Sequence, residues 1–432
     1  MGVQRQYEKS GVEDIGAYIA EQALQDQKAR RIPFDVVALP SNEISFEGEE
    51  KPPQHACEYF VVSLAIRERD TLEALARGIA RNEAAFFGGG ADVPFAGMEH
   101  WCPIEAPTFS NRAAAERLLE VPYVRDEKNL TGKNVNVVIV DQGLDAAALG
   151  ANYAGGWSVG KIRPGTTKPQ PGSDSRTHGM MIAQNILAVA PDARIFDLPL
   201  VPWKILDIPA FLSVANSAFW TMRAAIANFK ANPRFRGPWI IVNPWGIYDS
   251  RMDLRPPHDY INNPNHPFNK LVEAVVGDGH DVIFAAGNCG QFCPDERCGE
   301  QDYGPGRSIL GANSLGPVLT IGAVRTDTVW LGYSSQGPGQ SRLAHDKPDL
   351  CAPSQFCETG DAFTTNSGTS AACAVAAGVI AGLRSKRTAA AVTPPQLKSV
   401  LIKTAMKVDG QRWNGRRGNG ILNAKAAYNA IP

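Results

Sequence analysis

The chain has 432 residues, which is long for one ordinary hydrophobic core and predicts a domain of catalytic size with a smaller unit beside it. Hydrophobic residues make up 44% of the sequence and charged residues 20%, as in globular proteins. The 43 basic and 44 acidic side chains give a formal charge of -1 and form no long run of either sign, which excludes a nucleic-acid or anionic-membrane binder held by bulk charge.

The first part of the chain predicts a small α/β or α+β unit that carries no catalytic motif. Tyr59–Ile66 (YFVVSLAI) has the pattern of a strand, and Asp70 with Glu73 is typical of a capping box that opens a helix. The glycine-rich stretch 88–97 is a plausible boundary. We therefore expect an N-terminal unit at 1–105 and a catalytic-size domain at 106–432.

No targeting or membrane segment is visible in the chain as given. The first residues, MGVQRQYEKSGVEDIGAYIAEQ, contain no apolar run of signal-peptide length, which favours a cytoplasmic location. The longest run of small apolar residues, Ser370 to Leu383, has 14 residues and is shorter than the roughly 20 that cross a bilayer. We expect a buried helix there and no membrane span.

Strand and helix patterns alternate after Asn134. The apolar, β-branched runs are VNVVIV (135–140), ARIFDLPLV (193–201), WIIVN (239–243), DVIFAAG (281–287) and VLTIGAV (318–324). Helical patterns follow Asp207, where apolar residues share one face, and Thr393, which forms a capping box with Gln396. Such alternation predicts an α/β fold with a mostly parallel sheet and helices on both faces.

The eight cysteines leave three interpretations open. Cys289, Cys293 and Cys298 fall within ten residues of one another, where disulfides, a metal cluster or unbridged thiols are each conceivable. A metal cluster is disfavoured because no Cys-x-x-Cys pair and no nearby histidine completes a known ligand spacing. If disulfides form at 289–298, a secreted or periplasmic location becomes the alternative to the cytoplasm.

Candidate functional residues follow the carboxyl ends of predicted strands, where the loops of a parallel sheet converge. Asp141 directly follows one strand and Asn288 follows another, so both should project from the same edge. His178 lies at the start of a helical pattern and can face that edge. His280 precedes its strand, and we expect it to be a surface or turn residue.

Ser370 lies at the start of the helix of small residues, where two functions are open. Together with Ser367 and Thr369 it could cap the free N–H groups of the helix. It could also be a nucleophile, because the helix N-terminus offers N–H groups and a positive dipole end to an oxyanion. The order Asp141, His178, Ser370, with Asn288 as an amide donor, is the order of one known group of Ser-His-Asp proteases and favours the nucleophile.

Eight stretches give the chain a resemblance to the subtilisin-like serine proteases, the subtilase family. They are VVIVDQGLD, THGMMIAQ, VNPWG, VIFAAGN, LTIGAV with YSSQGPG, KPDLCAPS, SGTSAACAVAAGVIAGL and GNGILNAKAA, in family order from about residue 110 to 430. The resemblance implies a serine endopeptidase in which Asp141 orients His178 and His178 takes the proton of Ser370. Ser370 would form the acyl-enzyme, and Asn288 would hold the oxyanion.

The resemblance also implies a binding site for a protein or peptide substrate. The backbone at Trp245 and Gly246 and at Ala285, Ala286 and Gly287 would form the walls along which an extended peptide pairs as an added strand. No cofactor is evident from the residues, and calcium is possible through the resemblance alone. The N-terminal unit would be a pro-region that acts in cis on the active site, or else a permanent module for binding a partner.

Four departures from the family pattern lie near the expected site, and one of them is the Gly-Met-Met-Ile sequence after His178, which puts bulk beside the site. Gln142 replaces a usual Thr or Ser after the acid, and Cys373 stands near the position of a usual proline. Pro244 replaces a usual serine and cannot donate a backbone N–H to a substrate. None of these departures removes a catalytic group, so an active enzyme is favoured.

Two insertions, 248–267 and 289–313, follow the substrate-like strand and Asn288, and should rise from the catalytic edge or be surface decoration. Asp295, Glu296 and Arg297 in the second insertion could select charged side chains or face water.

Two competing functions remain beside the endopeptidase. The first is a catalytically silent scaffold that binds a protein partner. The second, a Ser-His-Asp hydrolase acting on esters or lipids, is disfavoured because no G-x-S-x-G elbow follows a strand.

Overall fold

The structure of the chain is a computed structural model that describes residues 108, 110–159, 170–173, 178–202, 205, 207–358, 361–408, 410 and 412–432. The described residues all belong to one compact unit, Ile104–Pro432. The predicted N-terminal unit at 1–105, with its strand, helix and boundary, lies outside the described residues.

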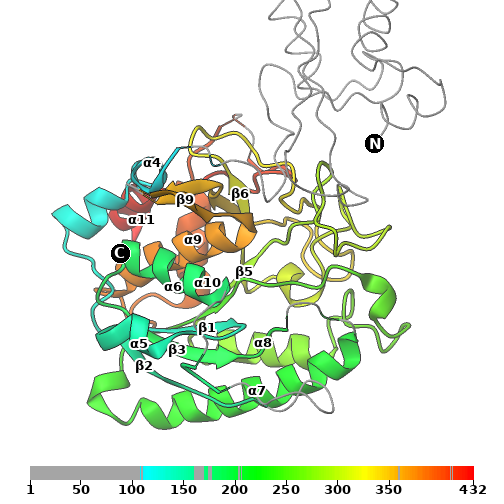
Figure 1. The fold of residues 1–432 in the computed structure, drawn as a ribbon, viewed down its shortest axis with the longest axis horizontal. Coiled ribbons are helices and arrows are strands. Elements are labelled where there is room, and N and C mark those ends of the chain that lie inside the picture. Colours follow the sequence, from blue (N-terminus) through cyan, green and yellow to red (C-terminus); the bar gives the residue numbers. More distant parts are fainter. Residues whose placement is uncertain are drawn as a thin grey trace, which may run out of the picture. The chain divides into compact units, whose positions relative to one another are not determined.

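The described residues form a seven-stranded sheet in which every neighbouring pair is parallel (Figure 1). The strand order is β2-β3-β1-β4-β5-β6-β7. The strands are β1 (Asn136–Asp141), β2 (Tyr153–Gly156), β3 (Arg194–Pro199), β4 (Trp239–Asn243), β5 (Asp281–Ala285), β6 (Leu319–Val324) and β7 (Leu350–Pro353). A separate antiparallel pair, β8 (Phe356–Glu358) and β9 (Asp361–Asn366), precedes the central helix.

Helices cover both faces of this sheet. In Figure 1, α6 and α9 lie on one face, and α7 and α8 lie on the other. The helices are α4 (Arg112–Leu118), α5 (Ala146–Leu149), α6 (His178–Val189), α7 (Ile208–Phe229), α8 (Pro267–Gly277), α9 (Gly368–Arg384), α10 (Pro394–Thr404) and α11 (Ala424–Ala430). The predicted α/β class with a mostly parallel sheet is therefore confirmed for this part of the chain.

The predicted local signals correspond to real elements. The helix after Asp207 is α7, and the Asp207 side chain accepts a hydrogen bond from the backbone N–H of Ala210. The capping box of Thr393 and Gln396 opens α10, which has prolines at its first positions. Two strands were not predicted as such. β2 (YAGG) and β7 (LCAP) are short and lie outside the longer apolar runs that contain the other five.

The central helix α9 explains the small residues that follow Ser370. All of its residues are buried. A Cβ built on Gly378 would lie 2.7 Å from the Val189 Cβ of α6, which is too close for any side chain. Small residues therefore let α9 pack closely on α6, and this contact fixes where the N-terminus of α9 lies.

His280 differs from the sequence-based expectation. We expected a surface or turn residue, but its side chain is buried, with 2% of its surface exposed. Burial lowers the pKa of His280 to about 4, so this imidazole is neutral over the physiological range. The residue precedes β5 and belongs to the end of the sheet opposite to Asp141 and Asn288.

Among the described helices, none combines the length and the apolar character that a membrane span requires.

Candidate active site

Asp141 and His178 are brought into direct contact. Asp141 is the last residue of β1, and His178 is the first residue of α6. The His178 Nδ1 lies 2.7 Å from the Asp141 Oδ2. The other carboxylate oxygen, Oδ1, accepts a hydrogen bond of 2.6 Å from the backbone N–H of Gln142. The replacement at position 142 therefore leaves the backbone donor that orients Asp141 in place.

A glycine makes this contact possible. A Cβ built on Gly179 would lie 2.4 Å from the carbonyl oxygen of Gly143, in the loop that follows β1. Any larger residue at 179 would push the start of α6 away from that loop. The glycine beside His178 thus sets the approach of the imidazole to Asp141.

The electrostatics of His178 come from burial and two charged groups. Burial lowers its pKa, the Asp141 carboxylate raises it by charge and hydrogen bond, and Arg297 lowers it by charge. The net effect is a pKa above the ordinary value of histidine. The His178 side chain keeps 35% of its surface exposed, whereas that of Asp141 keeps 4%, so the imidazole is the accessible member of the pair.

Ser370 lies in the first turn of α9, and its hydroxyl is not a helix cap. The Ser370 Oγ donates a hydrogen bond of 2.8 Å to the carbonyl oxygen of Pro244, which follows β4. The N-cap residue Ser367 makes no side-chain capping bond, and the Thr369 hydroxyl bonds elsewhere. The capping function is therefore wrong for these three residues, although the structure pairs Ser370 with Pro244 and not with His178.

Asn288 is fixed with its amide nitrogen turned away from Thr369. The backbone N–H and the hydroxyl of Thr369 both donate to the Asn288 Oδ1, each at 2.9 Å. The Thr369 hydroxyl in turn accepts from the backbone N–H of Gly287 at 3.1 Å. Because two donors meet one side-chain atom of Asn288, that atom must be the oxygen, and Nδ2 remains as a donor. Thr369 is thus a positioning residue that the sequence alone did not single out.

The two predicted substrate walls are joined by Asn313, another residue that sequence reasoning missed. Its Nδ2 donates to the carbonyl oxygens of Trp245 and Ala285, both at 2.8 Å. A Cβ on Gly246 would lie 3.1 Å from the same Nδ2, so a side chain at 246 would crowd the amide. Nothing in the local sequence around Asn313 marks this function, because the bond depends on how β4 and β5 are paired.

The Trp245 side chain belongs to the core. It is 5% exposed and packs edge-on against the rings of Phe211 and Phe284. Any contact of Trp245 with a peptide is therefore made by its backbone, as the resemblance implied. The assignment of Trp245, Gly246, Ala285, Ala286 and Gly287 to the substrate remains a prediction.

Cys373 is a second nucleophilic residue on α9, one turn beyond Ser370. It is fully buried, and burial raises the pKa of its thiol well above the ordinary range, with a smaller contribution from the Asp141 charge. A buried neutral thiol is a poor nucleophile. Cys373 therefore does not compete with Ser370 for a substrate.

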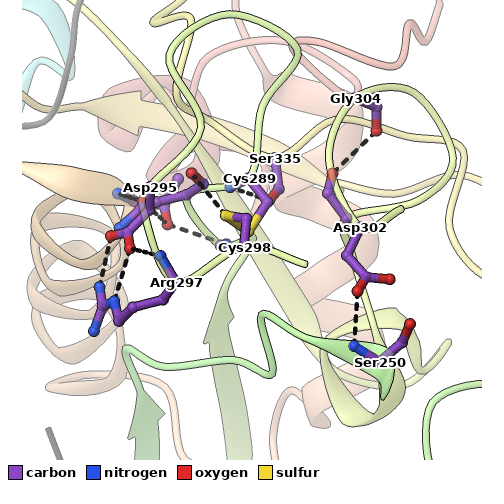
Figure 2. The surroundings of a disulfide bond; sticks show 12 residues. Ser250, Cys289, Asp295, Arg297, Cys298, Asp302, Gly304 and Ser335 are labelled. Carbon is purple, nitrogen blue, oxygen red and sulfur yellow. Dashed lines mark hydrogen bonds and ion pairs between the residues drawn. A yellow bond between two sulfur atoms is a disulfide. The ribbon is translucent and has the colours of Figure 1, made fainter. Parts of the chain in front are cut away.

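The two insertions are bonded to each other, as the contact between Ser250 and Asp302 in Figure 2 shows. Cys289 and Cys298 form a disulfide, so the disulfide interpretation of this loop is confirmed for that pair. Two hydrogen bonds join the insertions. The backbone N–H of Gly299 donates to the carbonyl oxygen of Tyr248 at 2.7 Å, and the backbone N–H of Ser250 donates to the Asp302 Oδ2 at 2.7 Å. The insertions thus form one structure that is anchored next to the candidate site.

A bound metal finds no support in this region. Among the residues that the structure describes, no group of three or more His, Cys, Asp or Glu side chains is arranged to hold an ion. Calcium stays an expectation from the resemblance alone.

The arrangement as a whole suits nucleophilic attack on a carbonyl. It combines an oriented imidazole of raised pKa, a hydroxyl in the first turn of a helix, and a fixed amide donor.

Comparison with known proteins agrees with this chemistry. A family model described as "Subtilase family" matches residues 132–420. Subtilisin E of Bacillus subtilis (strain 168) is 26% identical over 344 residues, which cover 75% of this chain and 76% of that one. Subtilisin of Bacillus pumilus is 26% identical over 308 residues, which cover 69% and 92%.

Solved structures share the fold. MycP1 from Mycobacterium smegmatis matches with a TM-score of 0.51 and 18% identity over 74% of this chain and 88% of that one. A second structure, of "a serine protease MycP1, an essential component of the type VII (ESX-1) secretion system", matches with a TM-score of 0.52 and 20% identity, covering 75% and 90%. At these identities the likeness establishes the fold.

Proposed function

This chain belongs to the subtilase family and is a subtilisin-like serine endopeptidase, and we propose that Asp141, His178 and Ser370 are its catalytic triad, with Asn288 in the oxyanion hole. The observation that carries the assignment is the 2.7 Å contact between the His178 Nδ1 and the Asp141 Oδ2, at the edge where α9 begins. Protein or peptide substrates follow from the family.

In the proposed reaction, the Ser370 hydroxyl leaves the Pro244 carbonyl and turns to the neutral Nε2 of His178. His178 takes the hydroxyl proton while the Ser370 Oγ bonds to the carbonyl carbon of the substrate, and the carbonyl oxygen becomes an oxyanion. The imidazolium then gives its proton to the leaving amine, and the acyl-enzyme remains. Water reverses these steps and releases the acid, and Asp141 stabilises the imidazolium throughout.

The Asn288 Nδ2 and the Ser370 backbone N–H would donate to the oxyanion. Thr369 supports this arrangement, because its two bonds to Oδ1 hold the amide in one orientation before substrate binds. Preorganised donors of this kind need no reorganisation when negative charge develops.

Peptide cleavage by matched variants tests the assignment. We expect Ser370→Ala and His178→Ala each to lose almost all cleavage of casein by the fully processed protein. Ser367→Ala, which changes a serine without a capping bond at the same helix start, should retain it. Cleavage by Ser370→Ala at the wild-type rate would refute the proposed nucleophile.

A catalytically silent scaffold is the second candidate, and one observation favours it. The Ser370 hydroxyl donates to the carbonyl oxygen of Pro244. This proline stands where the family usually has a serine, and it cannot donate a backbone N–H to a substrate. A scaffold would show no Ser370-dependent cleavage at any pH, and its partner binding would be unaffected by Ser370→Ala.

We further propose that residues 1–105 act in cis on this site. One solved structure of similar fold is described as "Crystal structure of MycP1 with the N-terminal propeptide removed", so that relative has such a segment. Adding the separate 1–105 segment to processed protein should inhibit peptide cleavage. Unchanged cleavage at saturating segment would favour a partner-binding module.

The disulfide bears on location. We propose an oxidising compartment, the secreted or periplasmic alternative, in preference to the cytoplasm, because the Cys289–Cys298 bridge needs such conditions to persist. Mass spectrometry of alkylated protein isolated from its source cells should find Cys289 and Cys298 protected. Alkylation of both would favour the cytoplasm.

A further inference from the structure

Arg297 is held beside the proposed oxyanion donor by the backbone of its own loop. The Cys289–Cys298 disulfide closes the loop immediately after Asn288. Within that loop, the backbone N–H of Asp295 donates to the carbonyl oxygen of Asn288 at 2.9 Å. The segment 295–297 is therefore folded back onto the backbone of Asn288.

The guanidinium of Arg297 has one defined orientation. Its Nε and Nη2 donate to the two carboxylate oxygens of Asp295 at 2.8 and 2.7 Å, as Figure 2 shows. Its carbon Cζ lies 4.8 Å from the centre of the Tyr248 ring, which comes from the first insertion. A bidentate pair combined with stacking restricts a side chain that would otherwise be flexible.

The cation is also accessible, and its charge acts on His178. The Arg297 side chain keeps 26% of its surface exposed, compared with 7% for Asp295, so the cation is the member of the pair that a ligand meets. The charged groups that act on His178 are Asp141 from β1 and Arg297 from this loop. On α9, the neighbouring Cys373 is a neutral thiol.

We propose that Arg297 is a specificity-determining residue that favours peptide substrates with an acidic side chain next to the scissile bond. The proposal rests on the proposed function, because a peptide bound between Ser370 and Asn288 passes the loop that Asp295 ties to Asn288. A carboxylate on that peptide is attracted by the guanidinium, and a lysine or arginine is repelled. Unit charges several ångström apart near a protein surface change affinity on the order of ten-fold.

The test is a set of fluorogenic peptides that carry Glu, Gln or Lys at each position flanking the scissile bond. For wild type we expect kcat/KM about ten-fold higher for Glu than for Lys at one of these positions. Arg297→Gln should bring the ratio close to one, and Arg297→Glu should reverse it. Arg297→Lys, which keeps the charge, should retain the preference for Glu.

Arg251 provides a matched control. It is paired to Asp249 through the same two nitrogens, both at 2.9 Å, but it lies in the first insertion with 59% of its side chain exposed. Arg251→Gln should leave the ratio of Glu to Lys unchanged. The Gln-containing peptide reports basal activity in every variant, which separates a change of preference from a loss of folding.

A pH profile gives an independent readout. Because Arg297 lowers the pKa of His178, Arg297→Gln should shift the acidic limb of kcat/KM to higher pH. Arg251→Gln should not shift it.

Equal cleavage of Glu and Lys peptides by the wild type would overturn the proposal and leave the proposed function intact. An undiminished preference in Arg297→Gln would overturn it as well. No turnover of any peptide would instead contradict the proposed function, and this inference with it.

Discussion

At the scale of single residues, the hydroxyl of Ser370 decides how the candidate site is interpreted. It donates to Pro244 while His178 is already oriented by Asp141. In the proposed reaction the hydroxyl leaves Pro244 and turns to His178. The sequence could place Ser370 at this edge, but it could not predict the bond to Pro244, because that bond depends on the direction of a carbonyl.

The amide of Asn288 is the group whose removal should separate chemistry from binding. Asn288→Ala deletes the proposed oxyanion donor and should lower kcat about 10²- to 10³-fold with little change in KM, which is the typical loss when one oxyanion-hole donor is removed. Steady-state kinetics on a peptide substrate measure both constants. A rise in KM with unchanged kcat would place Asn288 in ground-state binding instead.

The Asp141 contact makes a prediction about pH. Because the pKa of His178 is raised above its ordinary value of 6.5, kcat/KM should fall as pH decreases through an apparent pKa above 6.5. Asp141→Asn removes the carboxylate charge that raises the pKa of His178. It should move the acidic limb to lower pH and reduce kcat on the order of 10⁴-fold, as in other Ser-His-Asp proteases.

The pH profiles of the two proteins provide the measurement. An acidic limb that stays in place in Asp141→Asn would show that Asp141 does not govern the titration seen in kcat/KM.

At the scale of elements, the side chain of Asn313 joins the two backbone segments that are predicted to bind the substrate, 245–246 and 285–287. Asn313 donates to the carbonyl oxygens of Trp245, two residues after β4, and of Ala285, the last residue of β5. Asn313→Ala leaves two buried carbonyl groups without this donor, each costing about 1–3 kcal/mol. We expect KM for extended peptides to rise at least five-fold, with a smaller change in kcat.

Steady-state kinetics of Asn313→Ala on a long and a short peptide check this expectation. The control is Asn232→Ala, the same substitution at an exposed asparagine. An equal loss on both peptides would indicate general destabilisation and not a displaced wall.

A buried ion pair fixes the other end of α9. Arg384, at the last residue of this helix, donates to both oxygens of Asp281 at the start of β5, at 2.6 and 2.7 Å. Their side chains are 0% and 9% exposed. Arg384→Met would leave the Asp281 charge buried without a partner and should lower the free energy of unfolding by about 3–5 kcal/mol.

Urea denaturation of Arg384→Met measures this loss. The control is Arg223→Met, which removes an exposed pair with Asp278 whose side chains are 27% and 35% exposed. The exposed pair should contribute about 0–1 kcal/mol. Equal losses in the two variants would contradict the difference in burial on which the prediction depends.

At the scale of the whole molecule, the alternation of apolar strands and helices was sufficient to predict the fold class. Five of the seven sheet strands lie in apolar runs that the sequence marks as strands, whereas β2 and β7 lie outside such runs and pair with β3 and β6. The rule that parallel strands end at one edge predicted that Asp141 and Asn288 would lie on the same edge, and His178 was assigned to that edge from its place at a helix start. Their catalytic functions remain predictions.

The rest of the site could not be predicted, because it depends on contacts between side chains of elements that are distant in the sequence. Thr369 meets Asn288 from a different element, Asn313 connects two segments, and Arg297 is fixed by Tyr248 from another insertion. Such bonds have no periodicity that a single sequence can reveal. The burial of His280 has the same origin, because it is decided by packing and not by its place before β5.

The most direct test of the central claim is to locate a covalent adduct. Folded, fully processed protein is treated with a fluorophosphonate probe, and the labelled peptide is identified by mass spectrometry. The proposed triad predicts one adduct on the Ser370 hydroxyl, absent from Ser370→Ala and greatly reduced in His178→Ala. An unlabelled Ser370 in the wild type, or an adduct that persists in Ser370→Ala, would contradict it.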